Sequence, residues 1–538
     1  MKKIIITFLL VTSYISLFSQ NYVMNWQSCF GGSDFDYATD MVEFNNKFYI
    51  LGNTFSDDGD ISLLHGENDF WLVCTDYQGN MLWERTYGGS ESEGSHRILS
   101  TGEGYFYLLG TAFSSDGDIT NDPYLDSGDY WIVKVDSLGN IIWDKIVGGN
   151  AGENLWNGSL TSDGGVIAIG RTSSNDGDIR VFYGSKDVWI VKITSEGELE
   201  WDFTIGTDFA DEGQAIMQTS DGGYLVGGSS MLGQGGNITC EPHSSMADAI
   251  LTKLDADRNI EWQHCYGGSD HDGIVSLMEI DDGYIFGAYT SSNDGDVSGY
   301  NGGISDAWIV KIDFDGNIIW QNALGGSEGE SGVKDLFEIP SQGYVAFINT
   351  YSNDGDVSGN HSISEHYSDI WTVELDSDGM LINQQCFGGE GKEGLENGVI
   401  FKDRNHFVIA GQTDYGPSFD VGCSPHGGGG SNYDRDIWVF EVKDTTVNVQ
   451  EQLPATTGIS AYPNPAKDYV CFERKGKNNN RHLEISIYSA SGISVKELTL
   501  YPGETIKVWD TRSIRAGVYF YRSLRQDGTA EYGKIVLE

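Results

Sequence analysis

Apolar and polar residues alternate in short runs along most of the chain, and glycine-containing turns separate the runs. One stretch contains Leu155–Leu160, Val166–Thr172, Val188–Ile193 and Leu199–Ile205. Alternation with a period of two residues predicts half-buried β-strands. The joint between the first two runs, Ser162-Asp163-Gly164-Gly165, is typical of a tight hairpin. The sequence therefore predicts an all-β protein built from antiparallel strands.

This group of four strands recurs along the chain with a period of 57 to 63 residues. Two anchors mark each copy, Trp-x4-Gly-Gly and Asp-x-Trp. The first anchor begins at Trp26, Trp83, Trp143, Trp262 and Trp320, and degenerate copies begin at Trp201, with Gly206-Thr207, and at Asn383 in place of tryptophan. The second begins at Asp69, Asp129, Asp187, Asp306, Asp369 and Asp436, and in the fourth copy Asp248 is followed by Ile250 in place of tryptophan. Seven copies of a four-stranded unit predict a seven-bladed β-propeller.

The two ends of the repeat array are complementary. The first run, Val23–Phe30, matches the fourth strand of the unit, and the last run, Asp436–Val442, matches the third. We expect the N-terminal strand to complete the last blade, because every sheet then has four strands and no bare edge remains. Residues 26–443 also resemble bacterial seven-bladed propeller repeats. That resemblance implies a fold and no particular activity.

The N-terminus is typical of a secretory signal peptide. Met1-Lys2-Lys3 is followed by the apolar run Ile4–Leu10, which is too short to span a membrane. We expect cleavage after Ser19 and no transmembrane segment later in the chain. Export would place the cysteines in an oxidising space.

Charge divides the chain into two parts. It has 538 residues with 32 Lys+Arg and 80 Asp+Glu, a net charge of −48. Residues 445–538 hold 12 basic and 10 acidic residues, so residues 1–444 hold 20 basic and 70 acidic ones. Such acidity argues against nucleic-acid binding and against docking on anionic membranes. We expect a propeller over residues 20–444, a linker over 445–457 and a small Ig-like β-sandwich over 458–538, in a monomer.

The last 80 or so residues carry a recognisable set of motifs. They are Tyr462-Pro463-Asn464-Pro465, Ile487–Gly492, Ala516-Gly517-Val518-Tyr519 and the closing Gly533-Lys534-Ile535-Val536-Leu537-Glu538. In order and spacing they resemble the type A C-terminal sorting domain of the type IX secretion system. The resemblance implies a Gram-negative cell, contact with the type IX machinery, and a product released or attached to the outer surface. The alternative is an ordinary Ig-like adhesive domain.

Long loops on one face of the predicted propeller are rich in aspartate. Two hypotheses explain their Asp-Gly-Asp pattern. Calcium binding would use carboxylate oxygens on a flexible loop, whereas turn chemistry would use the same carboxylates to accept local backbone N–H groups. The candidate metal ligands are Asp58, Asp60, Asp116, Asp118, Asp176, Asp178, Asp294, Asp296, Asp354 and Asp356.

A second set of acids follows each Gly-Gly pair. In a propeller these residues would ring the channel mouth, either as a binding ring or as caps for backbone amides. The set is Asp36, Glu93, Glu153, Glu212, Asp272, Glu330 and Glu393, with Glu212 as the shifted member of the fourth unit.

The fourth and seventh units lack the Asp-Gly-Asp loop and contain Cys-x-Pro-His instead. We expect disulfides Cys240–Cys265 and Cys29–Cys423, the second of which would join the two ends of the ring. A zinc site formed by Cys240, His243, His264 and Cys265 is an alternative, and unlinked thiols are another.

No motif of a hydrolase, metalloprotease or phosphate-binding loop occurs. The histidines show no recurring position, and most tryptophans recur where blade cores are expected, with Trp156 and Tyr37 as exceptions beside the long loops. The sequence favours a non-catalytic surface protein that binds a glycan, matrix or protein partner. A polysaccharide hydrolase or lyase and a purely structural surface component are the alternatives.

Overall fold

The computed structural model describes residues 22–444 and 458–537 with short gaps. The gaps are 121–123, 125–126, 232, 234, 341, 404–405, 427–434, 463–465, 476–481, 490–493, 513, 515–516 and 525–529. The expected signal peptide and the linker over 445–457 lie outside the described residues. The chain divides into two compact units, Met1–Val447 and Asn448–Glu538.

The first unit consists of antiparallel sheets, and its described residues contain no helix. Sheet 1 contains β2 (Asp36–Phe44), β3 (Lys47–Thr54), β4 (Asp69–Asp76) and β5 (Met81–Tyr87). Sheet 2 contains β6 (Glu93–Ser100), β7 (Tyr105–Ala112), β8 (Asp129–Asp136) and β9 (Ile141–Val147). Sheet 3 contains β10 (Glu153–Leu160), β11 (Val166–Thr172), β12 (Asp187–Ile193) and β13 (Leu199–Ile205). Sheet 4 contains β14 (Asp211–Gln218), β15 (Tyr224–Ser230), β16 (Asp248–Leu254) and β17 (Ile260–Tyr266).

The remaining sheets follow the same order. Sheet 5 contains β18 (Asp272–Ile280), β19 (Gly283–Thr290), β20 (Asp306–Ile312) and β21 (Ile318–Leu324). Sheet 6 contains β22 (Asp335–Ile339), β23 (Gly343–Thr350), β24 (Asp369–Leu375) and β25 (Leu381–Phe387). Sheet 7 contains β26 (Glu393–Gly394), β27 (Val399–Asp403), β28 (His406–Thr413), β29 (Asp436–Asp444) and β1 (Tyr22–Phe30).

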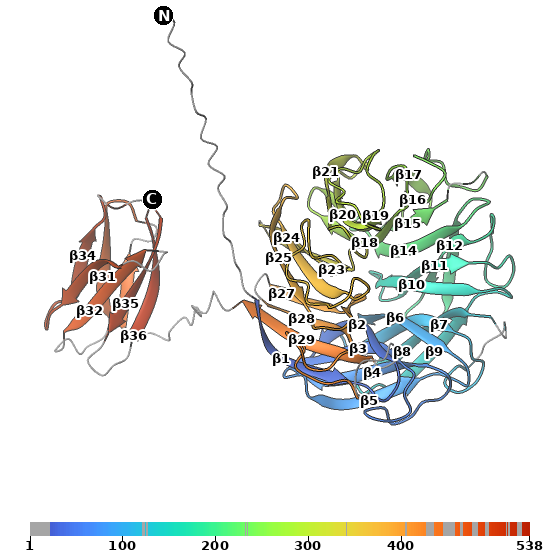
Figure 1. The fold of residues 1–538 in the computed structure, drawn as a ribbon, viewed down its shortest axis with the longest axis horizontal. Coiled ribbons are helices and arrows are strands. Elements are labelled where there is room, and N and C mark those ends of the chain that lie inside the picture. Colours follow the sequence, from blue (N-terminus) through green and yellow to red (C-terminus); the bar gives the residue numbers. More distant parts are fainter. Residues whose placement is uncertain are drawn as a thin grey trace, which may run out of the picture. The chain divides into compact units, whose positions relative to one another are not determined.

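The sheets are set around a common centre, as in β-propellers (Figure 1). The first strands contact one another in sequence from β2 to β6, β10, β14, β18, β22 and β27, and β27 contacts β2. The N-terminal strand β1 pairs antiparallel with β29, so that Cys29 lies opposite Trp438. Both ends of the repeat array therefore belong to one sheet.

The hydrophobic core lies between neighbouring sheets. The tryptophans of Asp-x-Trp are fully buried on the third strands, and two of them pack beside an aromatic ring of the neighbouring sheet. Phe70 and Trp131 rings, for example, are 4.8 Å apart, as are the rings of Tyr130 and Trp189. Large aromatic groups at these positions bury much apolar area, which stabilises the contact between sheets.

The second unit contains two antiparallel sheets. One consists of β30 (Gly458–Tyr462), β31 (Tyr469–Lys475) and β34 (Ile506–Asp510). The other consists of β32 (Leu483–Ser489), β33 (Ser494–Leu500), β35 (Gly517–Leu524) and β36 (Ala530–Leu537). Residues of both sheets, including Phe472 and Tyr521, share one core. Within the part of the chain that the structure describes, no helix is long and apolar enough to cross a membrane.

Candidate functional site

The acid that follows each Gly-Gly pair is buried and caps a backbone amide. Asp36 accepts a hydrogen bond from the Gly32 N–H (2.7 Å), and Glu93 accepts one from the Gly89 N–H (2.8 Å). Both carboxyls are fully buried, so they do not present a ring of free acids at the channel mouth. The alternative of amide caps fits this geometry.

In the fourth repeat the capping acid is Asp211, not the Glu212 that the sequence predicts. Asp211 accepts the Thr207 N–H at 2.7 Å and is fully buried. Glu212, the residue expected there from sequence, forms an ion pair with Arg171. The unit has Thr207 in place of the second glycine, and the acid still stands four residues after it. The capping acid therefore keeps its usual position in the fourth repeat.

In four of the repeats the first glycine of the pair, Gly31, Gly88, Gly148 or Gly325, lies between two carboxyl groups. A side chain on Gly31 would lie 2.4 Å from an oxygen of Asp436 and 2.8 Å from one of Asp36. Only glycine leaves room for both groups. The pKa of Asp36 is raised to about 6, chiefly by burial and in smaller part by the nearby Asp436 carboxyl, against the hydrogen bonds that the carboxylate accepts.

The Asp-Gly-Asp loops hold the Gly-Gly loops in place. Asp58 Oδ1 accepts the Ser33 N–H at 2.7 Å, and Asp60 Oδ2 accepts the Gly31 N–H at 3.2 Å. Gly59 between them has φ of 67°, a conformation that favours glycine. The same contact to the preceding Gly-Gly loop is made by the carboxylates of Asp116, Asp118, Asp176, Asp178, Asp294, Asp296, Asp354 and Asp356. Among the described residues, no cluster of three or more metal-ligating side chains is found.

Four histidines occupy equivalent positions, contrary to the expectation of scattered histidines. Nδ1 of His65, His243, His361 and His426 lies 2.7 to 3.1 Å from the aspartate of Asp-x-Trp in the same sheet. Nε2 of His243 lies 3.2 Å from Asp296 of the next sheet. His426 of sheet 7 faces Asp60 of sheet 1 at 3.6 Å. Their distances from the Asp-x-Trp anchor differ in sequence, which hides the pattern.

The cysteines of the two divergent units form disulfides in the structure. Cys29 is joined to Cys423, and Cys240 is joined to Cys265. His243 contacts aspartates and His264 contacts the Asp315 carbonyl, so the four side chains of the zinc alternative do not converge. Among described residues, Cys74, Cys386 and Cys471 are free thiols.

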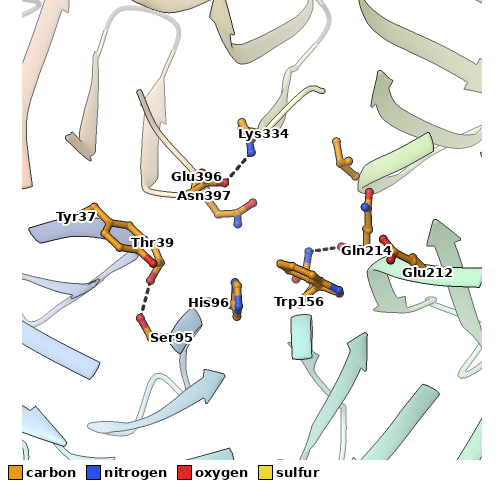
Figure 2. A pocket seen from close by; sticks show the side chains of 12 residues that line it. Tyr37, Thr39, Ser95, His96, Trp156, Glu212, Gln214, Lys334, Glu396 and Asn397 are labelled. Carbon is orange, nitrogen blue, oxygen red and sulfur yellow. Dashed lines mark hydrogen bonds and ion pairs between the residues drawn. The ribbon is translucent and has the colours of Figure 1, made fainter. Parts of the chain in front are cut away.

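A cavity of about 380 Å³ opens at the centre of the first unit. Its walls come from the first strands of the sheets, as Figure 2 shows. The lining residues are Tyr37, Thr39, Ser95, His96, Trp156, Asn157, Glu212, Gln214, Val275, Lys334, Glu396 and Asn397.

A β-bulge aims one side chain of the inner strand into this cavity in sheets 1 to 5. Pairing of β6 with β7 skips from Ser95 to Arg97, and pairing of β10 with β11 skips from Leu155 to Asn157. The skipped residues in sheets 1 to 5 are Thr39, His96, Trp156, Gln214 and Val275. A bulge redirects the extra side chain, which explains why these residues face the cavity.

The bulge residue stands three positions after the capping acid, and Glu396 has the same spacing from Glu393. The caps are chemically alike in every repeat, whereas these cavity positions carry six different side chains. Sequence analysis identified Trp156 and Tyr37 and missed His96, Gln214, Lys334 and Glu396. The recurring offset of three residues was the signal that could have found most of them.

Charges within the cavity are paired. Lys334 Nζ lies 2.6 Å from Glu396 Oε2, and Arg171 pairs with Glu212. The Arg171 guanidinium lies 6.0 Å from the Trp156 ring centre. Burial lowers the pKa of His96 to about 4, with Lys334 acting in the same direction and Glu396 opposing it. His96 is therefore neutral at pH 7.

Two polar atoms of the cavity wall lack partners. Within the described part of the chain, Trp156 Nε1 and Gln214 Oε1 are buried and have no hydrogen-bond partner. One is a donor and the other an acceptor, and both residues line the cavity. Buried polar groups without partners are costly, so a polar molecule that reached these two atoms would be stabilised by hydrogen bonds to them.

Residues 460–538 match the family described as secretion system C-terminal sorting domain. This segment is a sorting domain. Its presence makes the protein a secreted or cell-surface attached product of the type IX secretion system.

The motif residues of the sorting domain lie on three strands. Tyr462 ends β30 and is exposed, whereas Tyr519 on β35 is buried. Gly517 begins β35, and Gly533 and Lys534 lie on β36 opposite Tyr521 and Phe520. Pro463, Asn464 and Pro465 lie outside the described residues.

Other similarities are weaker. Regulatory protein FlaEY of Caulobacter vibrioides is 23% identical over 214 residues, which are 37% of this chain and 22% of that protein. The chain thus spans about a fifth of the curated relative that it matches. A puromycin hydrolase structure has 11% identity and a TM-score of 0.39, covering 84% of this chain and 61% of that one. A parainfluenza virus 5 hemagglutinin-neuraminidase ectodomain has 9% identity and a TM-score of 0.36, covering 79% and 87%. These structural likenesses are too low to bear on activity.

Proposed function

We propose that the first unit is a closed seven-bladed β-propeller that binds a glycan in its central cavity without cleaving it. The sorting domain delivers this propeller to the cell exterior through contact with the type IX machinery. In this proposal the acidic loops hold neighbouring blades together, and the ligand site is the cavity.

The unpartnered pair Trp156 Nε1 and Gln214 Oε1 carries the proposal. A sugar offers hydroxyl groups that can accept from the indole N–H and donate to the amide oxygen. The same ligand offers apolar C–H faces, and the cavity provides the rings of Trp156 and Tyr37. Ligand sites combine apolar walls with a few placed polar groups in this way, at volumes of roughly 300–1,000 Å³.

The carboxylates of the cavity favour binding over hydrolysis. A glycoside hydrolase needs one carboxyl that stays protonated as general acid. Glu212 and Glu396, the carboxyl groups that line the cavity, instead each form an ion pair with a cationic side chain, Arg171 and Lys334. Both carboxyls of the lining are therefore engaged with protein groups rather than placed alone in an apolar pocket as a general acid is.

Binding of the mature full chain to a glycan array tests the proposal. We expect specific binding that Trp156→Ala weakens by at least about 10-fold. Gly94→Tyr provides a second test, because Gly94 occupies the position that Tyr37 has in sheet 1 and a side chain there meets no atom within 4 Å. The added ring would fill part of the cavity without removing any contact.

Gly416→Tyr is the matched control, since Gly416 also lies in open space but outside the cavity lining. It should fold and bind as the original chain does. The proposal is contradicted if the chain binds no glycan. It is also contradicted if the Trp156 and Gly94 variants bind as tightly as the original chain. Release of reducing sugar from a bound polysaccharide would replace it with the hydrolase alternative.

A further inference from the structure

The cavity continues into a row of aromatic side chains on sheet 1. Tyr37 lines the cavity, and its ring centre lies 5.1 Å from that of Phe35. Phe35 in turn lies 5.8 Å from Phe55, which is 37% exposed. The Phe55 N–H donates to the Phe35 carbonyl at 3.0 Å, so the loop and the strand end hold both rings in place. The row therefore leads from the cavity to solvent.

Polar groups join the inner strands next to the cavity. One residue further along the same strands, Asp40 lies 3.4 Å from Arg97 Nε and accepts the Ile98 N–H. Next to them, the Asn397 backbone N–H donates to the Thr39 carbonyl at 2.9 Å, which joins sheets 7 and 1. The aromatic row on sheet 1, rather than this polar segment, offers apolar contact to a ligand chain that extends from the cavity.

The charges indicate which glycans fit. The first unit has a large excess of acidic residues, yet the cavity places Lys334 beside Glu396 and Arg171 beside Glu212. Each of these cations is thus paired with a carboxylate. His96 is enclosed by the channel walls next to Trp156, with ring centres 5.1 Å apart. An anionic sugar would face the acidic loops on approach and find no unpaired cation among the residues that line the cavity. Beside the aromatic row, the Arg435 guanidinium lies over the Phe35 ring, 4.9 Å from its centre, so a sugar can use only the other face of that ring.

We propose that the cavity binds the terminal unit of a neutral oligosaccharide and that Phe35 and Phe55 support the units that follow. This inference rests on the proposed function and adds the charge class, the direction and the extended contact of the ligand. Aromatic rings accept the apolar faces of sugars, and Phe55 presents its ring at the end of the row.

Phe113 supplies a matched control for Phe55. It follows β7 as Phe55 follows β3, and it is 45% exposed. Phe113 lies over Gly128, where an added Cβ would be 2.7 Å from its ring, and it lines no part of the cavity. Removal of either phenylalanine takes away an exposed ring at the same repeat position. Only Phe55 belongs to the row that begins at Tyr37.

The test uses the mature full chain and the neutral glycan that binds best on an array of neutral and acidic sugars. Its affinity is measured by calorimetry for the same glycan at increasing chain length. We expect affinity to rise with the first added units. Phe55→Ala should remove about 3- to 10-fold of affinity for the longer chains and leave the shortest ligand unchanged. Phe113→Ala should match the original chain at every length.

The outcomes separate this inference from the proposed function. Binding that depends on Trp156 but responds equally to both phenylalanine variants overturns the aromatic row and leaves the cavity site standing. Preference for acidic glycans overturns the charge class. Binding that is independent of Trp156, or no binding at all, contradicts the proposed function itself.

Discussion

Two adjacent residues of the fourth repeat have different roles, one in stability and one in the cavity. Asp211 is fully buried and accepts the N–H and hydroxyl of Thr207. Glu212 is the next residue, yet it reaches the cavity and pairs with Arg171. Sequence alone favoured Glu212 as the cap because the Gly-Gly signal is incomplete there. The position of the acid relative to the turn, rather than its identity, decides the role.

Replacement of these two residues should therefore have opposite effects. Asp211→Ala leaves the buried N–H and hydroxyl of Thr207 without their acceptor, so we expect it to lower the free energy of unfolding by about 2 kcal/mol. Glu212→Gln should change that free energy by less than about 0.5 kcal/mol, because its side chain is partly exposed. Urea unfolding monitored by tryptophan fluorescence measures both. Equal destabilisation by the two variants would contradict the assignment of the cap.

Strands and hairpins were predictable because the same alternation of apolar and polar residues, with glycine-containing turns, recurs in each repeat. The predicted runs Val166–Thr172 and Leu199–Ile205 coincide with β11 and β13. The bulges were not predictable, because a bulge depends on how two strands pair and leaves no fixed residue type behind. For the same reason the cavity escaped detection, while its caps and buried tryptophans, which recur unchanged, were visible.

Loops form the second kind of element, and their carboxylates accept backbone N–H groups of the neighbouring Gly-Gly loop. Asp58 and Asp60 illustrate the contact, at 2.7 and 3.2 Å. Calcium would have to displace these donors. We therefore expect the melting temperature of the mature chain to be the same in millimolar calcium and in EDTA. A rise of several degrees with calcium that EDTA reverses would show that the loops bind the cation in the native state.

At the scale of the molecule, the sheets of the first unit are tied together by buried acids and bridging side chains. Where sheets 7 and 1 meet, the bridge His426–Asp60, the disulfide Cys29–Cys423 and the β1–β29 pairing act together. In sheet 5 an asparagine makes the same bridge, since Asn301 Nδ2 donates to Asp356 at 2.7 Å. The bridge thus tolerates a neutral residue, which makes its histidine form testable.

The buried carboxyl groups between the sheets make the stability of the first unit depend on pH. Burial raises the pKa of Asp36 and Asp187 to about 6 and that of Asp306 and Glu393 to about 7. A folded-state pKa above the unfolded one means that the folded protein holds extra protons, so stability falls as pH rises through that interval. The acids that act oppositely, Asp163, Asp221 and Asp510, have pKa values lowered to about 2 and lose their contribution only below the normal aspartate range.

Histidines extend the same trend above pH 6. The Asp369 carboxylate raises the pKa of His361, and despite burial Asp436, with Asp60 and Asp36, raises that of His426. Their contribution is complete below the unfolded pKa of about 6.5 and is lost as pH rises through the folded value. His96 acts in the other direction, since burial lowers its pKa to about 4. The net charge of −48 adds repulsion that protonation relieves.

The mature chain should therefore unfold at a higher temperature near about pH 5 than near about pH 8, which calorimetry at matched ionic strength can measure. His426→Asn should keep the bridge to Asp60, as Asn301 does in sheet 5, but remove one titrating group. We expect this variant to lose less stability than the original chain between about pH 6 and pH 8. A melting temperature that rises with pH across this range would contradict the assignment, because it would require the carboxyls between the sheets to be stabilised in their ionised form. If the melting temperature of the His426→Asn variant falls with pH as steeply as that of the original chain, the pH dependence comes from the buried carboxyls alone. His426 then makes no contribution to it.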